Sequence, residues 1–209
     1  MYAKHKKGFT LIEVMVSIAI MIVILSIALF NHREFGNTIK LTNLAYDVAL
    51  SVRQAQVYGI SVRQTGTGSD PFEVPYGVYF FVNDTDIDYV FFADEDGTTN
   101  IGGEVKTGDG EYHRNSPPTA LACQTDTTEL CEGFTLPTGF IIKSIMGYST
   151  EGNNSGLEFH ITFRRPEPNA RLEDGTLNRD YYRIDIELES PEGLTKTVSV
   201  HENGNITVN

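Results

Sequence analysis

An apolar run close to the N-terminus constrains this chain more than any other feature. From Phe9 to Phe30 the only strongly polar residue is Glu13, and the stretch from Val14 to Phe30 carries no charge. A helix rises about 1.5 Å per residue, so this run is at the short end of what crosses a lipid bilayer. We therefore predict a transmembrane helix over residues 9–30.

Basic residues lie directly before this run, at Lys4, Lys6 and Lys7. Lysines that flank a membrane helix stay in the cytoplasm, which leaves the other end of the helix outside. The sequence thus predicts a single-pass protein of the cytoplasmic membrane with an extracytoplasmic C-terminal domain.

Three kinds of N-terminal segment share these features. An ordinary secretory signal is cut after its apolar run, where Ser26-Ile27-Ala28 has the small-x-small pattern of such a site. A permanent signal anchor is left uncut. The third interpretation starts from Glu13, because a carboxylate at the edge of the hydrocarbon region is costly and usually marks a function.

The residues around Glu13 favour the third interpretation. Residues 6–13 read KKGFTLIE and resemble the type IV prepilin motif at every position. The resemblance implies that prepilin peptidase cuts between Gly8 and Phe9, that residues 1–8 form the leader peptide, and that the new amino terminus of Phe9 is N-methylated. It also implies that the apolar helix stays in the mature protein.

Glu13 then has a structural role in assembly. A lone buried carboxylate is destabilising, but a charged amine placed against it makes its burial tolerable. The resemblance implies that this amine is the methylated amino terminus of Phe9 in an adjacent subunit. It also implies that the pair sets the axial register of the helices in the filament core.

Length and charge limit the remaining possibilities. The chain has 209 residues, which fits one globular domain plus an appendage. Its formal net charge of −12 argues against nucleic acid as a partner, since phosphate backbones are bound by surplus lysine and arginine.

The two cysteines, Cys123 and Cys131, are too few for a thiolate zinc site. We predict that they close a small disulfide loop, which requires an oxidising compartment. Two free thiols in a loop remain the alternative.

A second helical pattern follows the apolar run. Between Thr38 and Tyr58 apolar residues recur every three or four positions, which indicates an amphipathic helix packed on a sheet. Joined to the apolar run it gives one helix over residues 9–59, about 75 Å long at 1.5 Å per residue. Asn31 and Gly36-Asn37 are the predicted bend positions, and Gly59 is the predicted end.

Residues 60–209 change to short runs of β-branched and aromatic residues between turn-forming clusters. The predicted strands are 76–82, 89–93, 140–148, 157–164, 182–189, 194–201 and 206–208. Alternation gives each strand one solvent-facing side, which includes His160 and Thr162. The predicted fold class is therefore α+β, a long N-terminal hydrophobic helix followed by an antiparallel β-sheet domain.

The order of these segments also resembles a subfamily. LTNLAYDVALSVRQAQVYGISVR at 41–63, YGVYF at 76–80 and FFADEDG at 91–97 are similar to H-type pseudopilins of type II secretion and to FimT-like minor pilins. This resemblance implies a pilin fold. The insertion around 108–133, with both cysteines, departs from a minimal domain of that type.

Other chemistry has weaker support. Asp94 and Asp96 begin a sequence like a calcium loop, but position 12 falls on Val105 instead of glutamate, so a solvated acidic turn is the favoured interpretation. The histidines are scattered and no catalytic motif is present, which predicts that the chain is not an enzyme and needs no cofactor. Arginines gather between 164 and 183, where they could contact DNA or pair with nearby carboxylates.

Together these patterns predict a structural minor pilin or pseudopilin. Its expected partners are the prepilin peptidase and N-methyltransferase, other pilins or pseudopilins, the assembly platform of the inner membrane, and the membrane itself. The alternative from another class is a membrane-anchored or secreted β binding module of the adhesin type.

Overall fold

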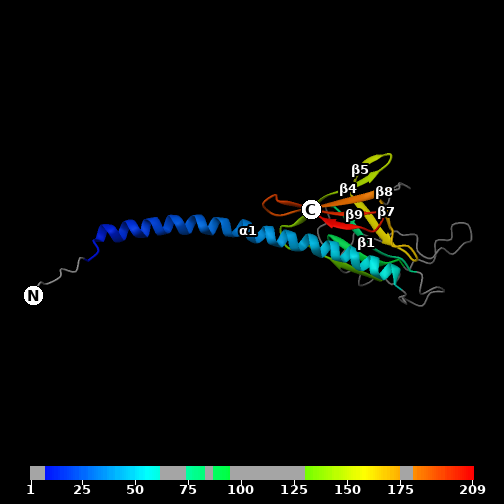
Figure 1. Cartoon of the computed structure of the whole chain (residues 1–209), viewed down its shortest axis with the longest axis horizontal. Helices are drawn as coiled ribbons and strands as arrows, with labels where there is room; N and C mark the ends of the chain where they lie inside the picture. The colour runs from blue at the N-terminus through cyan, green and yellow to red at the C-terminus, as the bar shows by residue number, and fades with distance from the viewer. Residues whose placement is uncertain (1–7, 62–73, 83–86, 95–129, 175–180) are drawn as a thin grey trace, which may run out of the picture.

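The computed structural model describes residues 8–61, 74–82, 87–94, 130–174 and 181–209 (Figure 1). Within these ranges the side chains at 28, 30–35 and 130 are not described. Most of the predicted leader peptide (residues 1–7), Cys123 and Asp96 lie outside the described residues.

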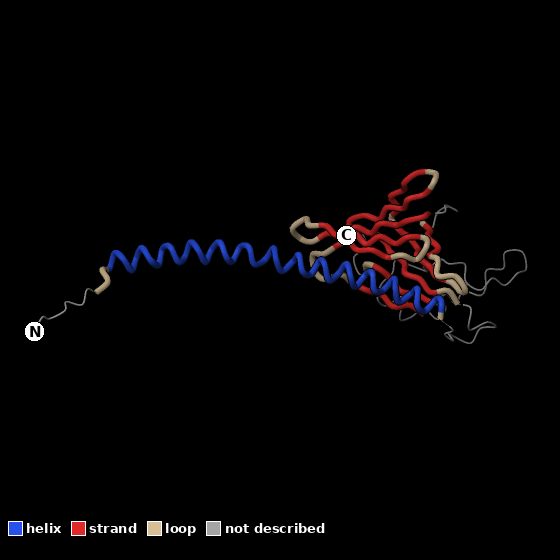
Figure 2. The backbone as a smooth tube through the Cα atoms, in the orientation of Figure 1, coloured by secondary structure: helices blue, strands red, loops and turns tan. Residues whose placement is uncertain are grey.

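A single helix dominates the shape of the molecule (Figures 1 and 2). Helix α1 runs from Leu11 to Ile60, a span of 50 residues, and rises about 75 Å. It passes through the predicted bend positions Asn31 and Gly36 without interruption, and the view shows only a gentle curve. It ends at Ile60, one residue beyond the predicted Gly59, and the extended backbone of the next residue, Ser61, stops the helix.

The rest of the described chain forms ten strands in two antiparallel sheets, which confirms the α+β class. The strands are β1 (Tyr76–Phe81), β2 (Tyr89–Ala93), β3 (Leu130–Phe134), β4 (Ile141–Ser149), β5 (Gly152–Gly156), β6 (Glu158–Phe163), β7 (Ala170–Glu173), β8 (Tyr181–Glu189), β9 (Thr195–His201) and β10 (Ile206–Val208). The first sheet has the order β3-β2-β1-β6-β7 and the second β10-β9-β8-β4-β5.

All seven predicted strands are present, with ends that differ by a residue or so. Strands β8, β9 and β10 are consecutive neighbours in the second sheet and form an antiparallel meander. Strands β3, β5 and β7 were not predicted. Strand β5 reads GNNSG and β7 has four residues, so neither carries enough alternation to be recognised.

The second half of α1 packs on both sheets and forms the main core with them. It contacts β1 and β6 in one sheet and β9 and β10 in the other. The residues of α1 buried there are Leu41, Leu44, Ala45, Val48, Val52 and Ala55. This confirms the prediction that the amphipathic face packs on a sheet.

Hydrogen bonds hold this half of α1 in register with the sheets. The side-chain amide of Gln56 is buried and donates to the carbonyl oxygens of Pro168, at 3.1 Å, and Gly204, at 3.2 Å. The hydroxyls of Ser51 and Tyr89 lie 3.2 Å apart. Burial, as the largest cause, raises the pKa of the Tyr89 phenol. Packing and polar contacts therefore fix the same segment of the helix.

The central strands of the first sheet, β1, β2 and β6, are buried on both faces. A second apolar cluster lies on the side away from the main core and contains Tyr79, Phe81, Ile87, Val90 and Phe92. The predicted solvent-facing side of β6 is therefore wrong: His160 is only 4% exposed, its ring 4.6 Å from that of Tyr79, and Thr162 is also buried. Alternation showed that the two sides of β6 differ, but it could not show that the polar side is covered.

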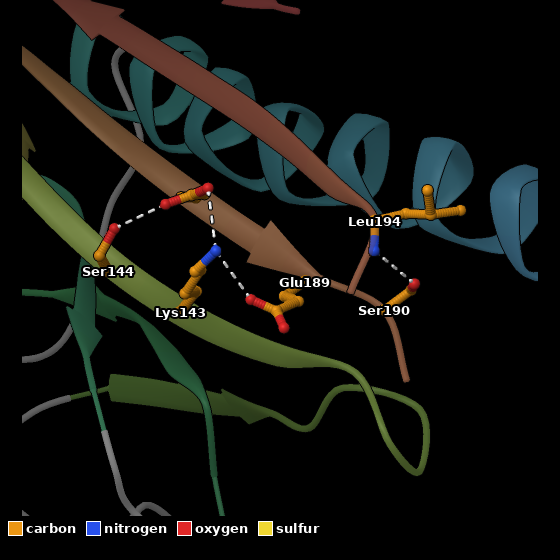
Figure 3. Close-up of polar contacts among 6 residues, drawn as sticks. Lys143, Ser144, Glu189, Ser190 and Leu194 are labelled. Carbon is orange, nitrogen blue, oxygen red and sulfur yellow. Dashed lines mark hydrogen bonds and ion pairs between the residues drawn. The ribbon is translucent and has the colours of Figure 1, made fainter. Parts of the chain in front are cut away.

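The second sheet keeps the predicted solvent-facing side. On β4 the Lys143 ammonium lies 3.0 Å from Glu189 and 3.6 Å from Glu187, both on β8 (Figure 3). The Ser144 hydroxyl donates to Glu187 at 3.0 Å. The pKa of Lys143 is raised, chiefly because its ammonium donates a hydrogen bond to Glu189. Such exposed pairs contribute little to stability and keep this face polar.

The turn between β8 and β9 lies where α1 leaves the domain. The amide of Gly193, which has a φ of +81°, donates to the carbonyl of Ser190 at 2.9 Å. The Ser190 hydroxyl accepts from the amide of Leu194 at 3.2 Å (Figure 3). At the tip of the turn, Glu192 accepts a hydrogen bond from the side-chain amide of Asn37. The turn thus holds the helix at the edge of the domain.

Two glycines of α1 provide a matched test of this packing. A Cβ at Gly59 would overlap the carbonyl oxygen of Phe163 and lie 2.8 Å from its carbonyl carbon, whereas a Cβ at Gly36 would meet no atom within 4 Å. We expect Gly59→Ala to lower the free energy of unfolding by about 1–3 kcal/mol. Gly36→Ala should leave it unchanged or raise it by up to about 1 kcal/mol, because alanine favours a helix. Denaturant unfolding measures both, and equal effects would contradict the close packing at Gly59.

Candidate functional site

The first turn of α1 is closed by a capping box. Thr10 is the N-cap, with an extended backbone at φ −81° and ψ 151°. Its hydroxyl accepts from the amide of Glu13 at 3.4 Å, and its own amide donates to the Glu13 carboxylate at 3.2 Å. The Thr10 hydroxyl lies 3.1 Å from the same carboxylate. Reciprocal bonds of this kind satisfy donors that a helix start otherwise leaves without partners.

The predicted cleavage site lies directly before this cap. Phe9 is 87% exposed, and Gly8 has no neighbouring atom where a Cβ would be. Neither residue belongs to the helix, because helical structure begins at Leu11. The Gly8–Phe9 peptide bond therefore lies in an accessible segment outside the helix, as an endopeptidase requires of its substrate.

Glu13, the predicted assembly residue, has a partner within its own chain. The sequence indicated a carboxylate that needs a partner from elsewhere, whereas Thr10 supplies hydrogen-bond donors in the single chain. The signal for this arrangement was present in the sequence, since a threonine three residues before a glutamate is the capping-box pattern. Pairing of Glu13 with the Phe9 amine of a neighbour stays a prediction.

The part of α1 beyond the domain, Leu11–Leu29, is here named the free half. Its large apolar side chains are each between 46% and 78% exposed. They occupy consecutive positions from Ile20 to Leu25, so they cover the whole circumference of the helix. The serine hydroxyls of the free half bond to the backbone of the helix itself. Ser17 donates to the carbonyl of Glu13 at 2.7 Å, and Ser26 donates to that of Ile22 at 2.8 Å.

In the part of the chain whose side chains are described, no helix combines the length and apolar character needed to span a membrane. The assignment of residues 9–30 as transmembrane stays a prediction.

Asp94, one of the two weak calcium candidates, does not lie in an exposed turn. Asp94 is 1% exposed, and its amide donates to the carbonyl of Pro75 at 3.0 Å. Asp88, also in the acidic segment, accepts from the amide of Leu136 at 2.6 Å. The expectation of a solvated acidic turn is therefore wrong for Asp94, which directly follows β2 and lies beside the residue that precedes β1. Among the described residues no group of histidine, cysteine and carboxylate side chains could hold a metal ion.

Cys131 lies on β3 opposite Phe92 of β2 and is disulfide-bonded. Its predicted partner Cys123 lies outside the described residues, so the pairing itself stays a prediction.

Described arginines of the C-terminal third contact carboxylates. Arg171 lies 2.7 Å from Glu173, and Arg183 lies 3.2 Å from Asp185. The guanidinium of Arg183 also stacks over the ring of Tyr148 at 3.9 Å. These contacts agree with the pairing alternative. Arg179 lies outside the described residues.

Comparison with known proteins gives one match. Residues 3–29 match the family model described as the prokaryotic N-terminal methylation motif. No curated protein and no solved structure matches the chain. The matched segment contains the exposed Gly8–Phe9 bond, the capping box and the whole free half of α1.

The capping box gives a test of its own. Thr10→Val removes the hydroxyl at nearly constant volume, so the first turn should lose about 0.5–2 kcal/mol of stabilisation, whereas Thr10→Ser should retain it. Hydrogen exchange of the amides of residues 11–14, in the full chain in detergent, measures the difference. Equal exchange in the valine and serine variants would show that the hydroxyl does not cap the helix.

Proposed function

We propose that this chain, which carries the type IV prepilin-like signal, is a structural minor pilin or pseudopilin that assembles into a filament through α1. The motif supports a pilin-like precursor that prepilin peptidase processes. The observation that carries the proposal is the combination of this motif, at residues 3–29, with a helix half whose large apolar side chains are exposed among the described residues.

Processing is the first step of the proposal. Prepilin peptidase cuts the Gly8–Phe9 bond, removes residues 1–8 and leaves Phe9 as an amino terminus for N-methylation. The exposure of both residues and the start of the helix at Leu11 support this step, since the bond is not involved in helical hydrogen bonding. The new amine then lies next to the N-cap residue Thr10.

The membrane is the second step. The motif implies a membrane-anchored subunit, and we place the free half of α1 in the hydrocarbon of the cytoplasmic membrane before assembly. Its apolar side chains face all directions, as expected of a helix that is surrounded by lipid or by other helices. Lys4, Lys6 and Lys7 keep the N-terminus cytoplasmic, and the β domain is extracytoplasmic.

Assembly is the third step. In the filament core the charged Phe9 amine of an adjacent subunit approaches Glu13 and makes its burial tolerable. Charge-assisted hydrogen bonds are roughly twice as strong as neutral ones, so the amine is a better partner than the neutral donors of Thr10. The pair would fix the axial position of one helix against the next.

The proposed partners follow from these steps. They are the prepilin peptidase and N-methyltransferase, other pilins or pseudopilins, and the assembly platform in the inner membrane. The domain, with a long helix packed across antiparallel sheets, is compatible with an H-type pseudopilin of type II secretion or with a FimT-like minor pilin. Such subunits act by polymerisation, and the motif points to a structural role and not to catalysis.

The mature N-terminus tests the first step. We expect mass spectrometry of protein from cells with the native processing machinery to find a chain that begins at N-methylated Phe9. An N-terminus near Leu29 would mean an ordinary secretory signal. An intact Met1 in cells with active peptidase would mean a simple anchor. Either result would overturn the proposal.

Glu13 tests the third step. Glu13→Ala should leave cleavage at Gly8–Phe9 intact and reduce incorporation into filaments, because the Phe9 amine of the neighbour loses its partner. Glu13→Asp, which keeps the charge on a shorter side chain, is the matched control and should retain more incorporation. The measurements are the N-terminal mass and the amount of subunit in sheared or purified filaments. Normal incorporation of the alanine variant would remove the assembly role from Glu13.

A further inference from the structure

Strand β5 contains an acceptor motif for asparagine-linked glycosylation. Residues 151–156 read EGNNSG, so Asn153, Asn154 and Ser155 form the pattern Asn-x-Ser in which the middle residue is not proline. An attached sugar is bulky and hydrated, so the acceptor asparagine must lie at the surface. Because three residues match such a pattern easily by chance, the position of the motif in the fold decides whether it can be used.

The motif lies in a hairpin that projects from the domain. Strands β4 and β5 pair as far as Ser149 and Gly152, and Figures 1 and 2 show the hairpin extending away from α1. Among the described strands β5 is the last of the second sheet, so one of its edges has no neighbouring strand there. Asn153 and Ser155 are both exposed, and the exposed Glu151 offers an enzyme a charged group beside them. A transferase can therefore approach the motif from the edge of the sheet.

The register of β5 places the acceptor and the hydroxyl of the motif on one side of the strand. Asn153 pairs with Tyr148 and Ser155 pairs with Met146. These two partners alternate with buried residues on β4, so they belong to the solvent-facing side of the second sheet. Residues two apart in a strand point to the same side. The Asn153 amide and the Ser155 hydroxyl, which the motif requires together, therefore face solvent together.

The fold uses the middle residue of the motif. The side-chain amide of Asn154 donates to the Asp174 carboxylate at 2.9 Å and to the Tyr181 hydroxyl at 3.2 Å. That hydroxyl donates to the same carboxylate at 2.6 Å, and Asp174 and Tyr181 are both buried. Asn154 thus points to the side opposite Asn153 and holds the hairpin on the domain. The anchoring contacts leave the acceptor side of the strand at the surface.

A second motif of the same kind, at 205–207, lies in a different environment. The amide of Asn205 donates to the side chain of Asn203 at 3.0 Å, and its carbonyl accepts from the amide of His201 at 2.9 Å. Strand β10, which contains the rest of this motif, packs against α1. A third motif, at 83–85, lies outside the described residues. Of the two described motifs, the one in β5 is therefore the more accessible acceptor.

We propose that Asn153 is a site of asparagine-linked glycosylation. The donor is a sugar whose anomeric carbon carries a diphosphate, which is linked in turn to a lipid or to a nucleotide. The side-chain nitrogen of Asn153 forms a bond to that carbon, and the bond between the carbon and the diphosphate oxygen breaks. The amide gives up one proton as the diphosphate leaves, and no group is oxidised or reduced. The inference goes beyond the proposed function, because assembly through α1 does not require a sugar.

A sugar at Asn153 has a physical role at this edge of the sheet. Unpaired strand edges offer hydrogen-bonding groups to other chains, and proteins usually block them with charges, proline or a covering segment. Strand β5 reads GNNSG, without a charged residue or a proline. A hydrated sugar beside the edge hinders pairing with another chain, as a charged side chain does on other edge strands.

Peptide mapping by mass spectrometry tests the site. Protein from cells with the native machinery is digested with trypsin, which places the motifs on three different peptides: 64–106, 144–164 and 197–209. We expect a fraction of peptide 144–164 to carry the added mass of sugar, and fragmentation to locate that mass on Asn153. Addition of one sugar indicates a nucleotide-linked donor, whereas a larger block of defined mass indicates a lipid-linked donor.

Three variants provide the controls. Asn153→Gln and Ser155→Ala should abolish the added mass, whereas Ser155→Thr, which keeps the hydroxyl, should retain it. Because both side chains are exposed, the midpoint of denaturant unfolding should be the same in all three, which shows that the fold is kept. An unmodified peptide 144–164 in the unaltered chain, sugar on the other two peptides only, or added mass that persists in Asn153→Gln would each overturn the inference.

The N-terminal mass of the same sample separates the two proposals. Chains that begin at Phe9 and carry no sugar on Asn153 overturn this inference alone. Chains that carry the sugar but keep an uncut N-terminus, or begin near Leu29, overturn the proposed function alone.

Discussion

The free half of α1 is the constraint on which the behaviour of this chain depends. Its described large apolar side chains are exposed, and burial of each would contribute roughly 1.5–3 kcal/mol of stabilisation. Among the described residues, the domain packs its core around the second half of the same helix, at Leu41, Val48 and Val52. In the function that we propose, lipid or other helices bury the free half.

Because α1 is continuous, the position of its free half is coupled to the position of the domain. The helix that is exposed at Leu11 is the same helix that lies in the core at Ala55, and it is unbroken between them. Gln56 and the Asn37–Glu192 contact hold it at both ends of the domain. A displacement of the free half along its axis is therefore a displacement of the domain. This coupling suits a subunit that is moved by its helix.

The sequence predicted the helix, seven strands and the family of the N-terminal motif, because each depends on local periodicity or on a short pattern. It failed where the answer depends on what covers a surface. His160 and Thr162 alternate with apolar residues as in an exposed strand, yet a second apolar cluster buries them. Asp94 follows a strand in an acidic stretch, yet it is buried beside Pro75. Tyr79 and Ile87 of that cluster are far from His160 and Thr162 in the sequence. No local pattern around His160 and Thr162 therefore reveals the cover.

The capping box changes the energetics expected of Glu13. In the single chain the carboxylate already accepts from Thr10, so in the assembly that we propose the gain is the difference between that cap and the Phe9 amine of a neighbour. In water this difference is small, because the Coulomb energy of a close ion pair is only about 1 kcal/mol at high dielectric. The same pair becomes several-fold stronger as the dielectric falls. In the proposed filament, exchange of partners at Glu13 is therefore favoured only when the free half is already surrounded by apolar side chains, and the proposal thus couples the choice of register to the burial of the helix.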